Sequence, residues 1–212
     1  IKEYIPIKKR KKNVIIVISQ LLNIWHAPTR KALYICEYYE KLGYKVKFAV
    51  FLLKSNDVKT MWMNSYMMHN FTEDTGEFSC SIENKNLEGY NLQIENEDNL
   101  NEIQHIIDYI YNLKPEFVFE IGEMTLIGDI CNNFTDVVTM SLTKNAPITN
   151  SKYIARYFRY TREDDIEFRR KLSEDQIVID VPHVATNTEV LTSTIVYSKE
   201  DFGIYEDNFL II

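Results

Sequence analysis

The sequence predicts an α/β fold: a doubly wound, mainly parallel sheet with helices on both faces. Three observations support this prediction. Continuous apolar runs rich in β-branched residues are typical of strands buried on both faces, amphipathic helical segments lie between them, and the alternation repeats along the chain. With 212 residues, 45% of them hydrophobic, the chain is long enough for one sizeable domain with a buried core.

The first third of the chain predicts a strand, a helix and a second strand. The run Asn13–Ser19 is apolar and β-branched, as expected of a central strand. Pro28 suits the first turn of a helix, and apolar residues recur at helical spacing until Gly43 supplies a stop. Residues 44–53 return to strand character, and a right-handed crossover makes them parallel to the first strand.

The alternation continues after a less regular region. Residues 54–96 are interpreted as an insertion or small β excursion, with strand-like pieces at 78–82 and 90–94. The later elements are a helix over 98–113, a strand over 117–121, a short helix over 126–134, strands over 137–142 and 153–158, a surface helix over 163–172 and a final strand over 177–181.

Composition excludes several classes of protein. The net charge of −7 argues against a nucleic-acid binder, which needs clustered Lys and Arg to neutralise phosphates. No apolar run approaches the roughly 20 residues that span a bilayer, and the first residues do not resemble a signal peptide, so we expect a cytoplasmic location. The three cysteines are far apart, which predicts reduced, mostly buried thiols and neither a disulfide framework nor a zinc site.

The familiar motifs of other α/β proteins are missing from the sequence. There is no GxGxxG after the first strand and no GxxxxGK[ST], which disfavours dinucleotide-binding and P-loop proteins. GxSxG is absent, which disfavours an α/β-hydrolase, and no acidic pair ends the first strand as a response regulator would require. Nothing resembles HxxxH or a DxD with flanking carboxylates, so no metal site and no cofactor are expected.

The loop after the first strand contains most of the candidate site residues. Ligands of open parallel sheets bind beyond the carboxyl ends of the strands, where this loop lies. His26 is the candidate catalytic residue, as a general base or as a donor that stabilises an oxyanion, and its alternative is to cap or pack the helix. Trp25, Thr29 and Arg30 are candidates for binding acceptor or substrate. Arg30 near a helix N-terminus favours an anionic partner, although an ordinary surface arginine is the alternative.

A second candidate group ends the strand at 117–121. Glu120 falls on the strand and Glu123 on the turn after Gly122. One of them can face the crevice while the other is solvated or bonds the N-terminal amides of the next helix, and a cap is one option for Glu123. A carboxylate can alternatively orient a histidine or bind acceptor hydroxyls.

Three segments resemble the N-terminal lobe of bacterial GT-B-type glycosyltransferases. They are Val14–Leu22 followed by His26–Arg30, the middle stretch Pro115–Phe134, and Tyr197–Ile212, which is similar to the bridge into the second lobe of such enzymes. The resemblance implies two Rossmann-like lobes that face each other across a cleft. The N-terminal lobe binds the acceptor, and the C-terminal lobe binds the nucleotide sugar.

The resemblance also implies a domain organisation and a site. Residues 1–12 are expected to be a linker with a solvated basic run at Lys8–Lys12, whose alternative is an anchor for anionic lipid. Residues 13–196 form the Rossmann-like lobe, and 197–212 lead into a donor lobe outside this chain. His26 and Thr29 lie at the cleft, and Glu120 and Glu123 lie on the acceptor side.

The expected function is sugar transfer from a nucleotide-sugar donor to a carbohydrate, protein or cell-envelope acceptor, without a catalytic metal. The enzyme is expected in the cytoplasm, with peripheral association with the inner face of the membrane as an option, and this lobe alone is expected to be inactive. The rival interpretation is a non-catalytic module that keeps the same fold to bind an acceptor protein or a partner enzyme.

Overall fold

The computed structural model describes residues 2–53, 74–94, 101–122, 126–158 and 160–181. Its strands are β1 (Asn13–Ile18), β2 (Lys45–Leu53), β3 (Gly76–Ile82), β4 (Lys85–Ile94), β5 (Phe117–Ile121), β6 (Asp136–Met140), β7 (Tyr153–Arg156) and β8 (Ile177–Asp180). Its helices are the 3-10 helix η1 (Ile7–Lys9), α1 (Ala27–Lys41), α2 (Ile103–Leu113), α3 (Leu126–Cys131) and α4 (Arg162–Arg170). Residues 1–181 form one compact unit.

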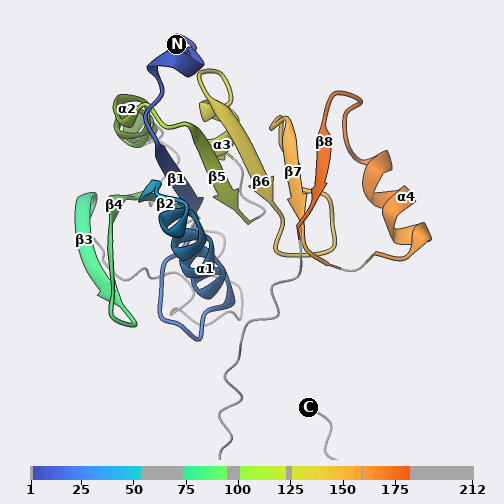
Figure 1. Ribbon diagram of the computed structural model, residues 1–212, viewed down its shortest axis with the longest axis horizontal. Helices are drawn as coiled ribbons and strands as arrows, with labels where there is room; N and C mark the ends of the chain where they lie inside the picture. Colours follow the sequence, from blue (N-terminus) through green and yellow to red (C-terminus); the bar gives the residue numbers. More distant parts are fainter. Residues whose placement is uncertain (1, 54–73, 95–100, 123–125, 159, 182–212) are drawn as a thin grey trace, which may run out of the picture. The chain divides into compact units, whose positions relative to one another are not determined.

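The described strands form one eight-stranded sheet in the order β3-β4-β2-β1-β5-β6-β7-β8, which Figure 1 shows with α1 in front of it. All neighbouring pairs are parallel except β3 with β4. The predicted α/β class with a mainly parallel sheet is confirmed, and the fold is Rossmann-like. Counted along the chain, the parallel strands run outward in both directions from β1, as in doubly wound sheets.

Helices cover both faces of the sheet, because alternate residues of each buried strand face opposite sides. Ile16 of β1 packs in one core cluster with Leu33 and Cys36 of α1. Ile15 of β1 packs in the other cluster with residues of α2 and α3. The strands are therefore apolar on both faces, which explains their continuous hydrophobic runs.

The interpretation of 54–96 as an insertion is wrong for β4. This strand pairs in parallel with β2, from Phe48 opposite Gly89 to Leu53 opposite Ile94, so it belongs to the main sheet. A two-residue turn at Glu83 and Asn84 joins it to β3, and both residues have positive φ, as tight hairpins require. The asparagine between two strand-like pieces was the sequence signal for this hairpin. Residues 54–73 and 95–96 lie outside the described residues.

The segment before β1 packs against the sheet at two points. Ile5 is buried, and its N–H donates to the carbonyl oxygen of Phe134 over 2.8 Å. The Arg10 side chain is only 4% exposed, and its Nη1 lies 2.5 Å from Asp136 Oδ2 and 2.8 Å from the Glu116 carbonyl oxygen. The lysines of the basic run are exposed as expected, but Arg10 is not, because it holds this segment to β6.

Candidate functional site

The order of the sheet reverses at β1, between the two candidate loops. From β1 the chain moves to β2 on one side, and β5 later adds on the other side. β1 and β5 pair so that Ile18 lies opposite Ile121, and their carboxyl ends are therefore neighbours. A ligand crevice of an open parallel sheet lies at such a switch point. The structure thus places the loop after β1 beside the carboxyl end of β5, the strand that holds Glu120.

His26 and Thr29 form a hydrogen-bonded pair at the start of α1. His26 is the residue before the first helical position, and its Nδ1 lies 2.8 Å from the Oγ1 of Thr29. Thr29 is fully buried, and the N–H of Leu22 donates to the same Oγ1 over 2.8 Å. This hydroxyl ties the loop after β1 to the helix and holds the imidazole in place.

The contacts of Thr29 assign the tautomer of His26. The hydroxyl accepts from Leu22, and within the described residues its own hydrogen finds an acceptor only at Nδ1 of His26. Because a buried hydroxyl that keeps an unpaired hydrogen is costly, Thr29 donates and the imidazole hydrogen lies on Nε2. Burial lowers the pKa of His26 below 6.5, so the ring is neutral at pH 7. The geometry favours the predicted role of His26 as a donor through Nε2 over that of a base.

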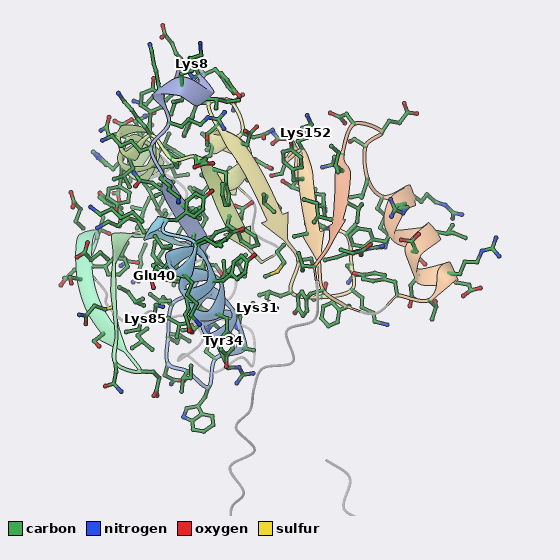
Figure 2. The ribbon with its side chains drawn as sticks, in the orientation of Figure 1. Lys8, Lys31, Tyr34, Glu40, Lys85 and Lys152 are labelled. Carbon is green, nitrogen blue, oxygen red and sulfur yellow. The ribbon has the colours of Figure 1, made fainter. Side chains whose placement is uncertain are left out.

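Two cationic side chains lie near the N-terminus of α1, whose first turn has no acidic residue. Across the described ranges, the half-buried guanidinium of Arg30 makes no hydrogen bond or ion pair. The Nζ of Lys31 lies 4.1 Å from the ring centroid of Tyr157, which follows β7. Burial lowers the pKa of Lys31. Figure 2 shows Lys31 near the lower end of α1, with Tyr34 beside it. Sequence reasoning missed Lys31, although it directly follows Arg30.

Trp25 is the exposed aromatic residue of the loop. Its side chain is 80% exposed, and its backbone N–H donates to the Oδ1 of Asn23 over 3.0 Å. A large aromatic side chain in water at a strand-to-helix loop is typical of a contact surface. The predicted binding role of Trp25 is therefore compatible with its position.

Glu120 is not on the acceptor surface, contrary to the prediction. It is fully buried, and the N–H of Gly128 in α3 donates to its Oε1 over 2.8 Å. Strand alternation turns its side chain, like that of Val118, toward α3, while Phe119 and Ile121 face α1. Burial raises the pKa of Glu120 to about 8. Glu123, the second predicted carboxylate, lies outside the described residues.

The surface grooves and the thiols lie elsewhere. Two shallow grooves over β3, β4 and α2 share Glu77 and Tyr109, and no residue of the loop after β1 lines them. Cys36 and Cys131 are buried and Cys80 is half-buried, and none of them is in a disulfide. Burial raises the pKa of Cys36 to about 12, which makes it an unreactive thiol. Its neighbours Glu40 and Lys85, seen side by side in Figure 2, form an ion pair of 2.8 Å between α1 and β4.

Among the described residues, no group of His, Cys, Asp and Glu side chains is arranged to hold a metal ion. Within the same residues no helix is both long and apolar enough to cross a bilayer. Comparisons with protein-family models, curated proteins and solved structures gave no match.

Proposed function

We propose that this chain is the acceptor-side lobe of a GT-B-type glycosyltransferase that transfers a sugar from a nucleotide-sugar donor to a carbohydrate, protein or cell-envelope acceptor. The observation that carries the proposal is the His26–Thr29 pair at the switch point between β1 and β5. A neutral imidazole of fixed tautomer, placed where open parallel sheets bind ligands, suits a site that handles charged oxygens. In this proposal the donor lobe lies outside the chain.

Transfer breaks the bond between the sugar C1 and the diphosphate oxygen and forms a bond from C1 to the acceptor oxygen. Negative charge grows on the departing diphosphate oxygen, and the proton of the acceptor hydroxyl passes to the departing diphosphate as the acceptor oxygen bonds to C1. His26 donates its Nε2–H to the oxygen on which charge develops, because Nδ1 already accepts from Thr29. Arg30, Lys31 and the N-terminus of α1 supply positive charge for the same anion.

The test is sugar transfer by the protein that carries both lobes, measured across several UDP- and GDP-sugars. His26→Ala is expected to lower kcat about 100-fold or more, since it removes a preorganised donor. His26→Gln keeps an N–H near the Nε2 position and should retain more activity than His26→Ala. His105→Ala is the matched control, because His105 is an exposed histidine of α2, whose residues pack on the opposite face of the sheet from α1. Unchanged turnover in His26→Ala would make this histidine structural.

The exposed Trp25 favours a second candidate, a non-catalytic module that binds an acceptor protein or partner enzyme. Tryptophan is enriched among the residues that dominate binding energy at protein interfaces. Measurements of turnover and of acceptor binding on the same protein distinguish the two functions. The module is favoured if no donor supports turnover while an acceptor still binds and Trp25→Ala weakens that binding.

A further inference from the structure

Exposed lysines gather at the edge of the sheet where the parallel strands begin. The backbone N–H of Lys45, the first residue of β2, donates to the carbonyl oxygen of Lys12 over 2.9 Å. The N–H of Lys11 donates to the carbonyl oxygen of Lys114, which follows α2, over 2.7 Å. These contacts bring three separate segments of the chain to one edge. We call its exposed lysines the basic edge: Lys8, Lys9, Lys11, Lys12, Lys45 and Lys114.

The basic edge carries positive charge, although the net charge of the chain is −7. Within the described ranges, five of its lysines make no ion pair: Lys8, Lys9, Lys11, Lys45 and Lys114. The segment before β1 contains six lysine or arginine residues and one acidic residue, Glu3. The nearby Asp136 already pairs with Arg10. The nearby Glu116 accepts a hydrogen bond from the Tyr44 hydroxyl over 3.3 Å. The lysine charge therefore faces solvent.

Two large side chains with apolar surface stand in water beside these lysines. Ile7 is 75% exposed and Tyr4 is 54% exposed. Arg10 fixes both residues, because its backbone N–H donates to the Ile7 carbonyl oxygen over 3.1 Å and its Nη2 donates to the Tyr4 hydroxyl oxygen over 2.6 Å. The Arg10 side chain is itself held by Asp136. The turn η1, which lies beyond the start of β1 in Figure 1, therefore presents Ile7 from a fixed position.

We propose that the basic edge, together with Ile7, binds the surface of an anionic lipid bilayer. The lysines attract the anionic headgroups, and Ile7 enters the boundary between headgroups and acyl chains. A nucleic acid has the same negative charge, but an aliphatic side chain does not stack on its bases. The exposed isoleucine is thus the feature that selects a bilayer. The inference is independent of the proposed transferase activity.

The position of the basic edge leaves the candidate site open. Figure 2 shows Lys8 and Lys31 toward opposite ends of the sheet. Lys31 lies in the first turns of α1, at the carboxyl edge, whereas Lys8 lies before β1. A bilayer at the basic edge therefore does not cover the loop after β1. Membrane binding and sugar transfer can be measured, and can fail, separately.

Co-sedimentation of the full chain with lipid vesicles tests the proposal. The probes are vesicles of phosphatidylcholine alone and vesicles that also contain about 30% phosphatidylserine. The chain should sediment with the anionic vesicles and stay in solution with the neutral ones. Binding should weaken as salt is added, because salt screens the attraction between exposed charges.

Charge reversal at the basic edge should abolish most of this binding. The triple variant Lys8→Glu, Lys9→Glu and Lys11→Glu should lower the partition coefficient on anionic vesicles about 100-fold or more, since each lysine near the surface contributes to the attraction. The three side chains are exposed and lack ion pairs with the described residues, so the fold should be kept. Thermal unfolding of the variant checks this.

The matched control reverses the same number of exposed cations on α4 and at its C-cap, in the part of the chain that precedes β8. The triple variant Arg162→Glu, Arg170→Glu and Lys171→Glu changes the net charge by the same amount. It should bind anionic vesicles nearly as wild type does, because charges distant from the bilayer are screened.

Ile7→Ser tests the apolar contribution alone. It should lower the partition coefficient about tenfold, because one aliphatic side chain no longer leaves water, and it should keep the salt dependence of wild type. Three results would each overturn the proposal. They are equal binding to neutral and anionic vesicles, equal losses in the two triple variants, and binding to an RNA or DNA oligonucleotide without binding to anionic vesicles.

Discussion

His26 follows the end of β1, and Glu120 lies near the end of the neighbouring strand β5, yet the two side chains have opposite environments. His26 lies beyond the end of β1, is half-buried and keeps one ring nitrogen free of contacts with the described residues. Glu120 lies one residue before the end of β5, where both faces of the sheet are covered, and is fully buried. The difference teaches that a polar residue inside a parallel strand belongs to the core. Only residues past the last strand pair reach the crevice.

Substitution of Glu120, the buried residue of this pair, should have the largest effect on stability. Glu120→Ala leaves a cavity and removes the partner of the Gly128 N–H, so it should lower the free energy of unfolding by about 3 kcal/mol. Urea unfolding at pH 6 measures this. Glu120→Gln, which keeps the contacts, should stay within about 1 kcal/mol of wild type. Equal losses in both variants would mean that the hydrogen bonds of Glu120 contribute little.

Substitution of Gly128 should lower stability by a smaller amount. The missing side chain of this glycine leaves room for the Glu120 carboxyl under α3. A Cβ at this position would lie 2.2 Å from the Oε2 of Glu120, so Gly128→Ala should lower the free energy of unfolding by about 2 kcal/mol. The double variant Glu120→Ala with Gly128→Ala should lose less than the sum of the single losses, because the new methyl group enters the space that the carboxyl leaves. Strict additivity would show that the two residues do not compete for space.

At the start of α1, substitution of Thr29 should lower the free energy of unfolding more than substitution of His26. Thr29→Val keeps the shape but leaves the Leu22 N–H without a partner, which should cost about 1 kcal/mol. His26→Ala should cost less, since it removes a half-buried ring, yet it should have the larger effect on transfer. Thermal unfolding and transfer rates of both variants check this. A reversed order in stability would place His26 among the structural residues.

Trp25→Ala should have the smallest effect on stability. The indole is 80% exposed, so its loss should change the free energy of unfolding by less than about 0.5 kcal/mol. Acceptor binding, followed by calorimetry, is where a change is expected. A large loss of stability would instead show that the side chain packs on the protein in solution.

Most of the fold could be predicted because its signals are local. Apolar β-branched runs marked the buried strands, and Gly43 marked the end of α1, where its φ of 80° suits glycine. The edge of the sheet on which the loop after β1 lies followed from the rule that ligands of parallel sheets bind beyond the carboxyl ends of the strands, whereas the switch point at β1 came from the strand order in the structure. The placement of β4 in the main sheet was missed, because parallel pairing with β2 depends on contacts distant in sequence.

The candidate site divides along the same line. The sequence by itself determined where His26 and the first turn of α1, with Thr29 and Arg30, lie, since a strand followed by a helix must place its connection at the carboxyl edge of the sheet. Only the tertiary structure decided that Thr29 sets the tautomer of His26 and that Glu120 joins Thr139 and Ser151 beneath α3. Hydrogen bonds between side chains require atoms to meet within about 3 Å. Periodicity along one strand or helix does not contain that information, because such contacts form only when separate segments pack together.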